Sequence, residues 1–120
     1  MTSLQNKLKK VRDALLSIEI NDKPIDGKLV CHFERPKEKY DHWIVWQEDG
    51  EGVSFSGNNR KKEQQGRGTV DCFTKIEYDP LLDLIQEALD NAPDIAWALE
   101  FVQYEDDTKL IHYEWSFMVV

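Results

Sequence analysis

The C-terminal segment Leu110-Ile-His-Tyr-Glu-Trp-Ser-Phe-Met-Val-Val120 decides the fold class. Large apolar residues fall at every second position, with polar residues between them: Ile111, Tyr113, Trp115, Phe117 and Val119 against His112, Glu114 and Ser116. Because successive side chains of a strand point to opposite faces of its sheet, this pattern predicts a strand with one face in the core. The run Trp97–Tyr104 precedes it across the acidic turn Glu105-Asp-Asp-Thr-Lys109, so we expect the two runs to form a hairpin.

A helix and another strand are predicted upstream of this hairpin. Asp79-Pro80 marks a helix start, because aspartate accepts backbone N–H bonds as an N-cap and proline is tolerated at the first helical position. The helix should end by Asn91-Ala-Pro93 and cover a sheet. Thr69–Ile76 alternates as a strand, with Val70, Cys72, Thr74 and Ile76 on one side and Asp71, Phe73 and Lys75 on the other.

The N-terminal half supplies the remaining elements. Apolar residues recur every three or four positions over Leu4–Ile18, which predicts an amphipathic helix. Gly27–Phe33 is a short strand candidate, and Trp43–Trp46 is apolar on both faces, as in an interior strand. The order α-β-β-β-α-β-β predicts an α+β fold with a mostly antiparallel sheet of about five strands and two helices on one face. We expect one domain over residues 1–120.

Residues 50–68 form a polar, glycine-punctuated segment between the second and third predicted strands. Gly57–Gly68 contains four cations and one anion and is therefore net +3, whereas the whole chain is −8 and the rest accordingly carries −11. A structureless loop this long is uncommon in a compact domain unless it is functional or disordered. We predict a long mobile loop that becomes ordered on a protein partner; the alternative is a disordered, solubilising loop.

Composition favours a folded protein of the reducing cytosol. Apolar residues make up 41% of the 120 residues, which suffices for one core. The N-terminus has no signal-peptide pattern, and no window is apolar enough to cross a bilayer, so we expect no membrane partner. A charge of −8 repels bare nucleic acid over most of the surface, so direct nucleic-acid recognition is not expected.

The sequence offers weak candidates for chemistry. The spacing of Cys31, His32, His42 and Cys72 does not match known zinc ligand pairs, and neighbouring strand residues such as Cys31 and His32 face opposite ways. Neither Ser54 nor Ser56 lies in a nucleophile elbow. The acids Glu77, Asp79, Asp83, Glu87 and Asp90 are interpreted as a helix cap and a solvated helix face. We therefore expect neither an enzyme nor a bound metal or cofactor.

The pattern as a whole resembles the tail terminator, or tail completion, proteins of long-tailed bacteriophages and prophages, a family that includes the lambda tail terminator and relatives in phages of Gram-positive hosts. The resemblance spans nearly the full chain. Its matching pieces are Leu4–Ile18, Tyr40-Asp-His-Trp-Ile-Val-Trp-Gln-Glu48 before the polar insertion, Val70-Asp-Cys-Phe-Thr-Lys75, the helix Asp79–Asn91 and the closing Ile111-His-Tyr-Glu-Trp-Ser-Phe117.

This resemblance implies a virion protein that forms a hexameric ring on the completed tail tube, stops tube polymerisation and offers a surface to the connector of the filled head. Its expected partners are other copies of itself, the tail tube protein and the head–tail connector protein. Its expected locations are the host cytoplasm during assembly and the head-proximal end of the tail. A closed ring needs two different complementary surfaces on each subunit. The partner-binding candidates are Arg60, Lys61, Lys62, Arg67, Glu105, Asp106 and Asp107.

Two other functions remain open at this point. A head-closure or adaptor protein also forms rings at the head–tail joint, and the sequence separates the two roles poorly. An acidic inhibitor that mimics DNA and binds a host enzyme would cluster its acids on one face. Here the acids are spread through helix faces and turns, and Glu105-Asp-Asp107 is the one dense run.

Overall fold

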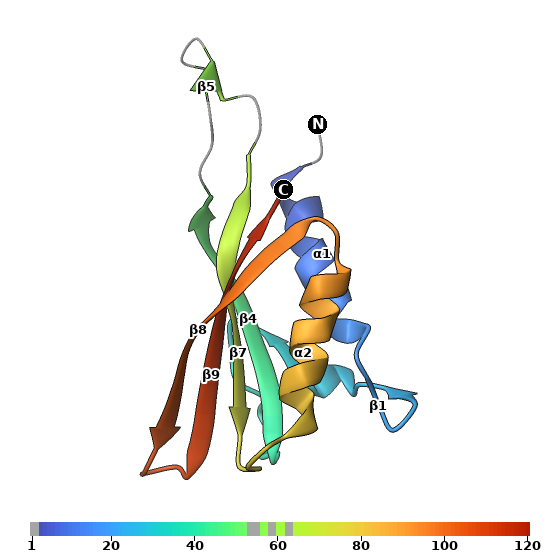
Figure 1. Ribbon diagram of the computed structural model, residues 1–120, viewed down its shortest axis with the longest axis vertical. Helices are drawn as coiled ribbons and strands as arrows, with labels where there is room; N and C mark the ends of the chain where they lie inside the picture. The colour runs from blue at the N-terminus through green and yellow to red at the C-terminus, as the bar shows by residue number, and fades with distance from the viewer. Residues whose placement is uncertain (1–2, 53–55, 58–59, 62–63) are drawn as a thin grey trace.

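The computed structural model describes residues 3–52, 56–57, 60–61 and 64–120, and its α+β architecture confirms the predicted fold class (Figure 1). A five-stranded sheet has the order β3 (Val30–His32), β4 (His42–Glu51), β7 (Gly66–Thr74), β9 (Leu110–Val119) and β8 (Ile95–Glu105). The helices α1 (Leu4–Leu16) and α2 (Pro80–Asn91) lie on one face of it. Short additional elements are β1 (Glu19–Ile20), β2 (Lys23–Pro24), the 3₁₀ turn η1 (Gly27–Leu29), β5 (Ser56–Gly57) and β6 (Arg60–Lys61).

The sheet is antiparallel except at one edge. β4 pairs with β7, β7 with β9 and β9 with β8 in antiparallel fashion, whereas β3 runs parallel to β4. The expected strand over Gly27–Phe33 is therefore shorter than predicted, because its first three residues form the 3₁₀ turn. β3 and β8 are the two outer strands, so each has one side without a neighbour in the sheet.

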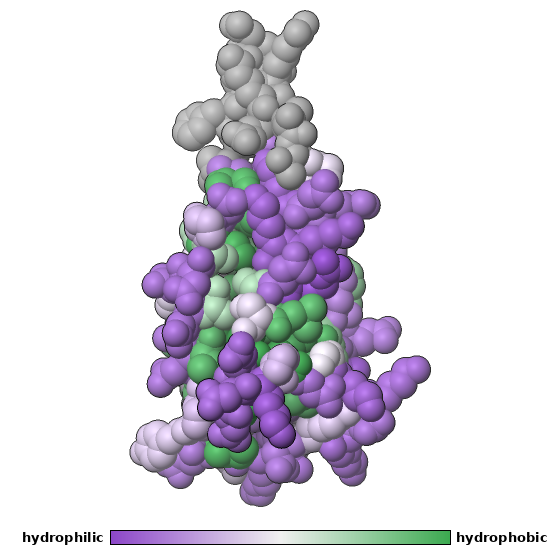
Figure 2. All heavy atoms as spheres, turned by 90° about the vertical axis from the view of Figure 1, so that its right-hand side faces the viewer, coloured by the Kyte–Doolittle hydropathy of each residue, from purple (hydrophilic) through white to green (hydrophobic). Residues whose placement is uncertain are grey.

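The main core lies between the helices and the sheet. The alternation predicted for the last strand is confirmed, because Trp115, Phe117 and Val119 are buried in this core. The helices contribute the residues of their apolar faces: Leu8, Val11 and Leu15 from α1, and Leu81, Ile85 and Leu89 from α2. Figure 2 views the helical side, where polar residues cover most of the surface and apolar residues show between them.

A smaller apolar cluster lies on the opposite, helix-free face of the sheet. Trp43 and Val45 of β4 pack there with Phe73 of β7 and Leu110 of β9. Their neighbours Ile44 and Trp46 point into the main core. β4 is thus buried on both faces, as its sequence predicts. The main core covers one face and the smaller apolar cluster covers the other.

The predicted loop over residues 50–68 is shorter in the structure. β4 continues to Glu51 and β7 begins at Gly66, so the two strands form a long hairpin whose tip contains the β5–β6 pair. Residues 53–55, 58–59 and 62–63 lie outside the described residues, and the mobility expected of this segment stays a prediction. Gly66 and Gly68, which fall within the predicted loop, belong to the strand β7.

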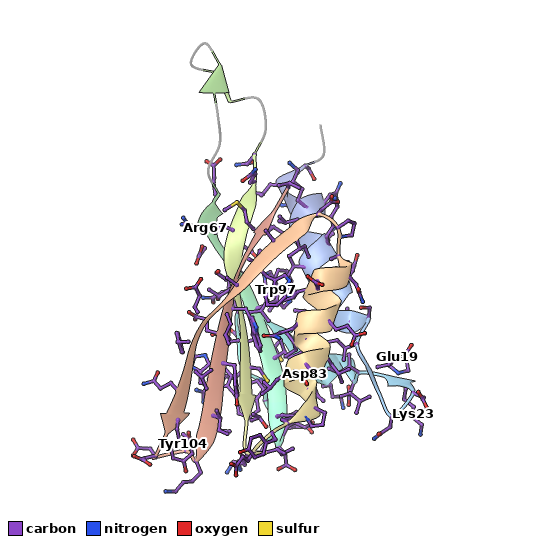
Figure 3. All side chains as sticks on the ribbon, viewed as in Figure 1. Glu19, Lys23, Arg67, Asp83, Trp97 and Tyr104 are labelled. Atoms are coloured by element: carbon purple, nitrogen blue, oxygen red, sulfur yellow. The ribbon has the colours of Figure 1, made fainter. Side chains whose placement is uncertain are left out.

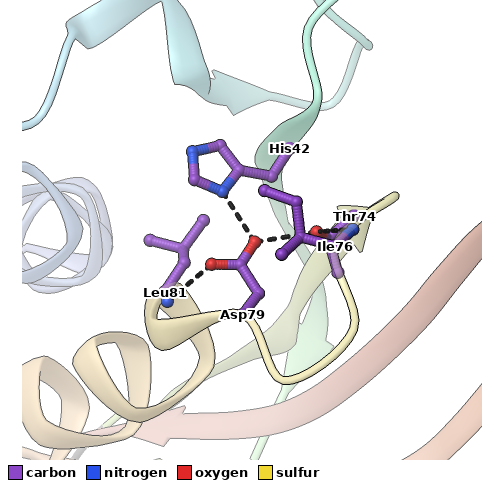
Figure 4. Close-up of polar contacts among 5 residues, drawn as sticks. All are labelled: His42, Thr74, Ile76, Asp79 and Leu81. Carbon is purple, nitrogen blue, oxygen red and sulfur yellow. Dashed lines mark hydrogen bonds and ion pairs between the residues drawn. The ribbon is translucent and has the colours of Figure 1, made fainter.

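The start of α2 is fixed by Asp79, which is buried despite its charge (Figure 4). One carboxylate oxygen accepts the backbone N–H of Leu81 at 2.9 Å. The other accepts the Thr74 hydroxyl at 2.7 Å and lies 2.7 Å from His42 Nδ1. Burial raises the pKa of Asp79, but the bonds from Leu81, His42 and Thr74 outweigh it and hold the pKa below its ordinary value. The predicted N-cap is confirmed, and it also joins α2 to β4 and β7.

Asp79→Ala should lower the free energy of unfolding by about 2–3 kcal/mol at neutral pH, because it removes a cap and leaves buried polar partners unpaired. The pKa of an aspartate in the unfolded chain is about 3.9. Because the pKa of Asp79 is lower in the folded protein, its carboxylate stabilises the fold above that pH. This stabilisation is lost as the pH falls through the pKa of Asp79 in the folded protein. Urea titrations of wild type and variant should therefore converge in acid. Asp83→Ala, on the exposed part of the same helix, is the control; an equal effect of both would refute the assignment.

No helix among the described residues is long and apolar enough to span a membrane.

Candidate functional site

The outer strand β8 is the most exposed apolar feature of the sheet. Its inner side pairs with β9 from Ile95 to Glu105, and none of the strands in the described part of the chain lies beside its outer side. Four of its large apolar side chains are substantially exposed: Leu99 at 45%, Phe101 at 38%, Val102 at 51% and Tyr104 at 54%. They fall within six consecutive residues, so they form one continuous apolar edge, here called the β8 edge.

The β8 edge is exposed because the helices cover only the first part of the strand. Ile95 and Trp97 pack in or against the main core, and Figure 3 shows Trp97 beside the helices. Tyr104 lies at the far end of the strand, away from both helices. The register with β9 shifts between Leu99 and Phe101, where Glu100 accepts the Ser116 hydroxyl at 2.7 Å. The strand therefore continues beyond the helical layer with apolar residues on both of its faces.

This edge has few of the features that normally prevent association: one register shift and one charged residue. Native edge strands are protected by charged residues, proline, short length or a covering loop. Between Ile95 and Tyr104, β8 contains Glu100 as its one charged residue and has no proline. An unpaired row of backbone groups flanked by apolar side chains can add a strand from another chain. We interpret the β8 edge as a protein-binding surface.

The predicted acidic residues continue directly from this edge. Glu105 ends β8, and Asp106 and Asp107 are exposed in the following turn. Glu105 accepts the Thr108 hydroxyl at 3.1 Å, which fixes the turn, and its carboxylate lies 4.0 Å from His112 Nδ1. The three acids thus lie together at one end of the molecule.

The predicted basic residues lie at the opposite end. Arg60 and Lys61 are in β6, which pairs with β5 at the hairpin tip, and Lys62 is outside the described residues. Arg67 is in β7, where its Nε donates to Asp49 at 3.1 Å, so it is partly neutralised. Figure 1 places β5 and the β8–β9 turn at opposite ends of a molecule 51 Å long. One chain therefore does not bring its own acidic and basic candidates together.

A groove of about 530 Å³ runs along the other outer strand of the sheet. It lies between α1 and the strands β3 and β4, and its apolar lining includes Leu8, Leu16, Val30 and Trp46. His32 stacks on Trp46 with ring centroids 4.0 Å apart, and its Nε2 lies 2.8 Å from Glu48. The groove opens on the helical side at the edge opposite to β8.

The cysteines and histidines considered as metal ligands do not converge. His32 contacts Glu48, His42 contacts Asp79, and none of Cys31, His32, His42 and Cys72 belongs to a group of three or more potential ligands among the described residues. Burial raises the pKa of the Cys72 thiol, and also that of Cys31, which disfavours their reactive thiolate forms.

Sequence reasoning identified the acidic turn but missed the β8 edge. The available signal was the run Leu99–Tyr104, whose apolar residues fall on both faces of the strand. Such a run usually indicates burial on both sides.

No family model matches the chain, and no curated protein is recognisably similar to it in sequence.

Proposed function

We propose that this protein is a structural virion protein that forms a hexameric ring at the head-proximal end of a phage tail tube. In this role it stops tube polymerisation and provides the surface for head–tail joining. The observation that carries the proposal is the uncovered β8 edge, which gives each chain a surface suited to another protein chain. The resemblance of the sequence to tail terminator proteins supplies the identity of the assembly.

Ring closure requires a head-to-tail contact between two different surfaces. The two outer strands of the sheet offer such a pair, because β8 runs opposite to β3 in the same sheet. Rotation about an axis along the strands preserves strand direction, so β8 of one subunit would meet β3 of the next in antiparallel orientation. β3 contains three residues, so backbone pairing there is short and side chains must supply most of the contact.

The groove beside β3 fits this arrangement. Leu99, Val102 and Tyr104 are paired with Trp115, Tyr113 and Ile111, so they point to the helical side of the sheet. The groove between α1 and β3 opens on that same side. When β8 lies beside β3 of a neighbour, Leu99 and Val102 face this groove and can be buried in it. The contact therefore combines strand pairing with apolar burial.

The charge distribution gives such a ring two different rims. The strands run along the long axis, so all hairpin tips would gather at one rim and all Glu105–Asp107 turns at the other (Figure 1). The first rim contains Arg60, Lys61 and Lys62, and the second contains Glu105, Asp106 and Asp107. We assign one rim to the tail tube and the other to the head–tail connector, with Arg60, Lys61 and Lys62 on the tube side.

A charge reversal tests this assignment. The triple variant R60E/K61E/K62E should still form rings but lose binding to purified tail tubes, because its rim would become acidic. Pelleting of the protein with tubes measures the loss. The variant K23E/K75E/K109E has the same change in charge and should bind like wild type. Unchanged tube binding by the first variant at physiological salt would contradict the proposal, and rings that bind only the connector would indicate a head-closure protein instead.

A further inference from the structure

The helix-free face of the sheet contains a compact group of potential metal ligands that belongs to neither surface described above. Asp71 of β7 and Glu114 of β9 are directly opposite each other, and His112 lies two residues earlier on β9. One donor atom from each of the three lies within 4.8 Å of the other two. Both strands are inside the sheet, so the backbone that holds these donors is fixed on each side.

The imidazole is oriented by its surroundings. The His112 ring stacks on Phe73 with centroids 4.2 Å apart, and the edge of Phe101 approaches it at 5.1 Å. Its Nε2 lies 2.7 Å from an oxygen of Asp71, while its Nδ1 faces Glu105 at 4.0 Å. A histidine that binds a metal through one nitrogen commonly directs the other to a carboxylate. Around His112, the carboxylate that faces the second nitrogen is that of Glu105, at ion-pair distance and not at hydrogen-bond distance.

The two carboxylates are held in place at an electrostatic cost. Asp71 is only 8% exposed, and its second oxygen accepts the Thr69 hydroxyl at 3.2 Å. Like charges directly opposite on neighbouring strands are destabilising. Two carboxylates and one imidazole therefore lie together on the two central strands.

Two neighbouring arginines make their contacts outside this group of ligands. Arg67 is bonded to Asp49, and the guanidinium of Arg35 lies over the Phe73 ring at 5.2 Å from its centroid. Among the described residues, His112 is the basic side chain that lies within ion-pair distance of Asp71.

We propose that Asp71, His112 and Glu114 form a binding site for a divalent transition-metal ion of the zinc type. One imidazole nitrogen and two carboxylate oxygens are ligands that zinc accepts, and imidazole favours it over magnesium or calcium. The ion would connect the two central strands β7 and β9 and leave its remaining positions to water. This proposal does not depend on the proposed virion role.

Calorimetric titration of the EDTA-treated full chain with zinc chloride at neutral pH tests the site. We expect one ion per chain and a rise in the unfolding temperature on zinc addition, with magnesium producing neither. H112Q and E114Q should each weaken zinc affinity by about 10-fold or more. Circular dichroism of each variant without metal verifies its fold, and E114Q keeps the shape of the side chain if H112Q proves unstable.

H32Q is the matched control, because His32 contacts one carboxylate, that of Glu48, on the other face of the sheet. C31S tests whether the partly buried thiol contributes. Both variants should bind zinc as wild type does. The proposal is overturned if wild type does not bind zinc, if H112Q and E114Q bind as tightly as wild type, or if C31S abolishes binding.

Discussion

Replacing Val102 and Tyr104 together by lysine should abolish self-association and leave the fold intact. Both side chains are about half exposed in the single chain, so the free energy of unfolding should change by no more than about 0.5 kcal/mol. In the ring, the exposed half of each side chain would be buried against the neighbouring subunit, which contributes about half of the roughly 1.5–3 kcal/mol of full burial. Losing both should weaken association at least about 10-fold.

Sedimentation velocity of V102K/Y104K and wild type, alone and with tail tubes, measures this loss. Lysine on an outer strand is also a natural means of preventing strand addition. The control is Tyr78→Lys, which changes an 87% exposed apolar residue just before α2 and away from the β8 edge. Y78K should assemble as wild type does. If V102K/Y104K assembles equally well, the β8 edge is not the subunit contact.

Gly68→Ala should be the most destabilising small substitution in the β4–β7 hairpin. Gly68 lies opposite Glu48 on β4 and opposite Phe117 on β9, next to the register shift between Glu48 and Gly50. A Cβ at this position would clash with the carbonyl oxygen of Gln47 and lie 2.7 Å from the Phe117 ring and 2.8 Å from Glu48 Cα. Two of these obstacles are backbone atoms, so a side-chain rotation cannot relieve the overlap.

We expect G68A to lower the free energy of unfolding by about 3 kcal/mol, the upper part of the range for overpacked sites. Chemical denaturation followed by tryptophan fluorescence measures it. G27A is the matched control, because a Cβ on Gly27 would meet no atom within 4 Å. That change should be neutral or stabilise by about 0.5 kcal/mol, since alanine restricts the unfolded chain. Similar stabilities for both variants would contradict the packing assigned to Gly68.

The sequence predicted those elements whose signals are local. The alternation of Trp115, Phe117 and Val119 determines which face of β9 is buried, and Asp79-Pro80 fixes the start of α2 through hydrogen bonds within a few residues. The apolar run Trp43–Trp46 predicted an interior strand because packing on both faces requires apolar residues at every position. Each of these inferences needs only the periodicity or capping chemistry of one element.

The extension of the β4–β7 hairpin could not be predicted in the same way. Gln47–Glu51 is polar and contains a glycine, so it has the composition of a loop, yet its backbone pairs with Gly66–Thr69. Gly68 lies in the segment whose composition predicts a loop, but in the structure Gln47 and Phe117 approach it so closely that they leave no room for a side chain. Such contacts depend on which strands are neighbours, and periodicity within one strand contains no such information.

The same limit applies to both functional surfaces. The sequence placed Asp71 on one side of its strand and His112 and Glu114 on the polar side of another. That these strands are adjacent follows only from the sheet order β7-β9. The exposure of Leu99–Tyr104 likewise depends on how much of β8 the helices cover, whereas the sequence of this run resembles that of a core strand.

Native mass spectrometry of the wild-type protein, alone and after incubation with purified tail tubes, tests whether the chain assembles into a ring. We expect a complex of six chains of 14.1 kDa each, formed alone at high concentration or on the tube as template. A ring-forming protein can remain monomeric until its tube is present, so the measurement with tubes decides whether this chain forms a ring. A chain that stays monomeric or dimeric with tubes present, and does not bind them, would contradict the ring and its β8 contact.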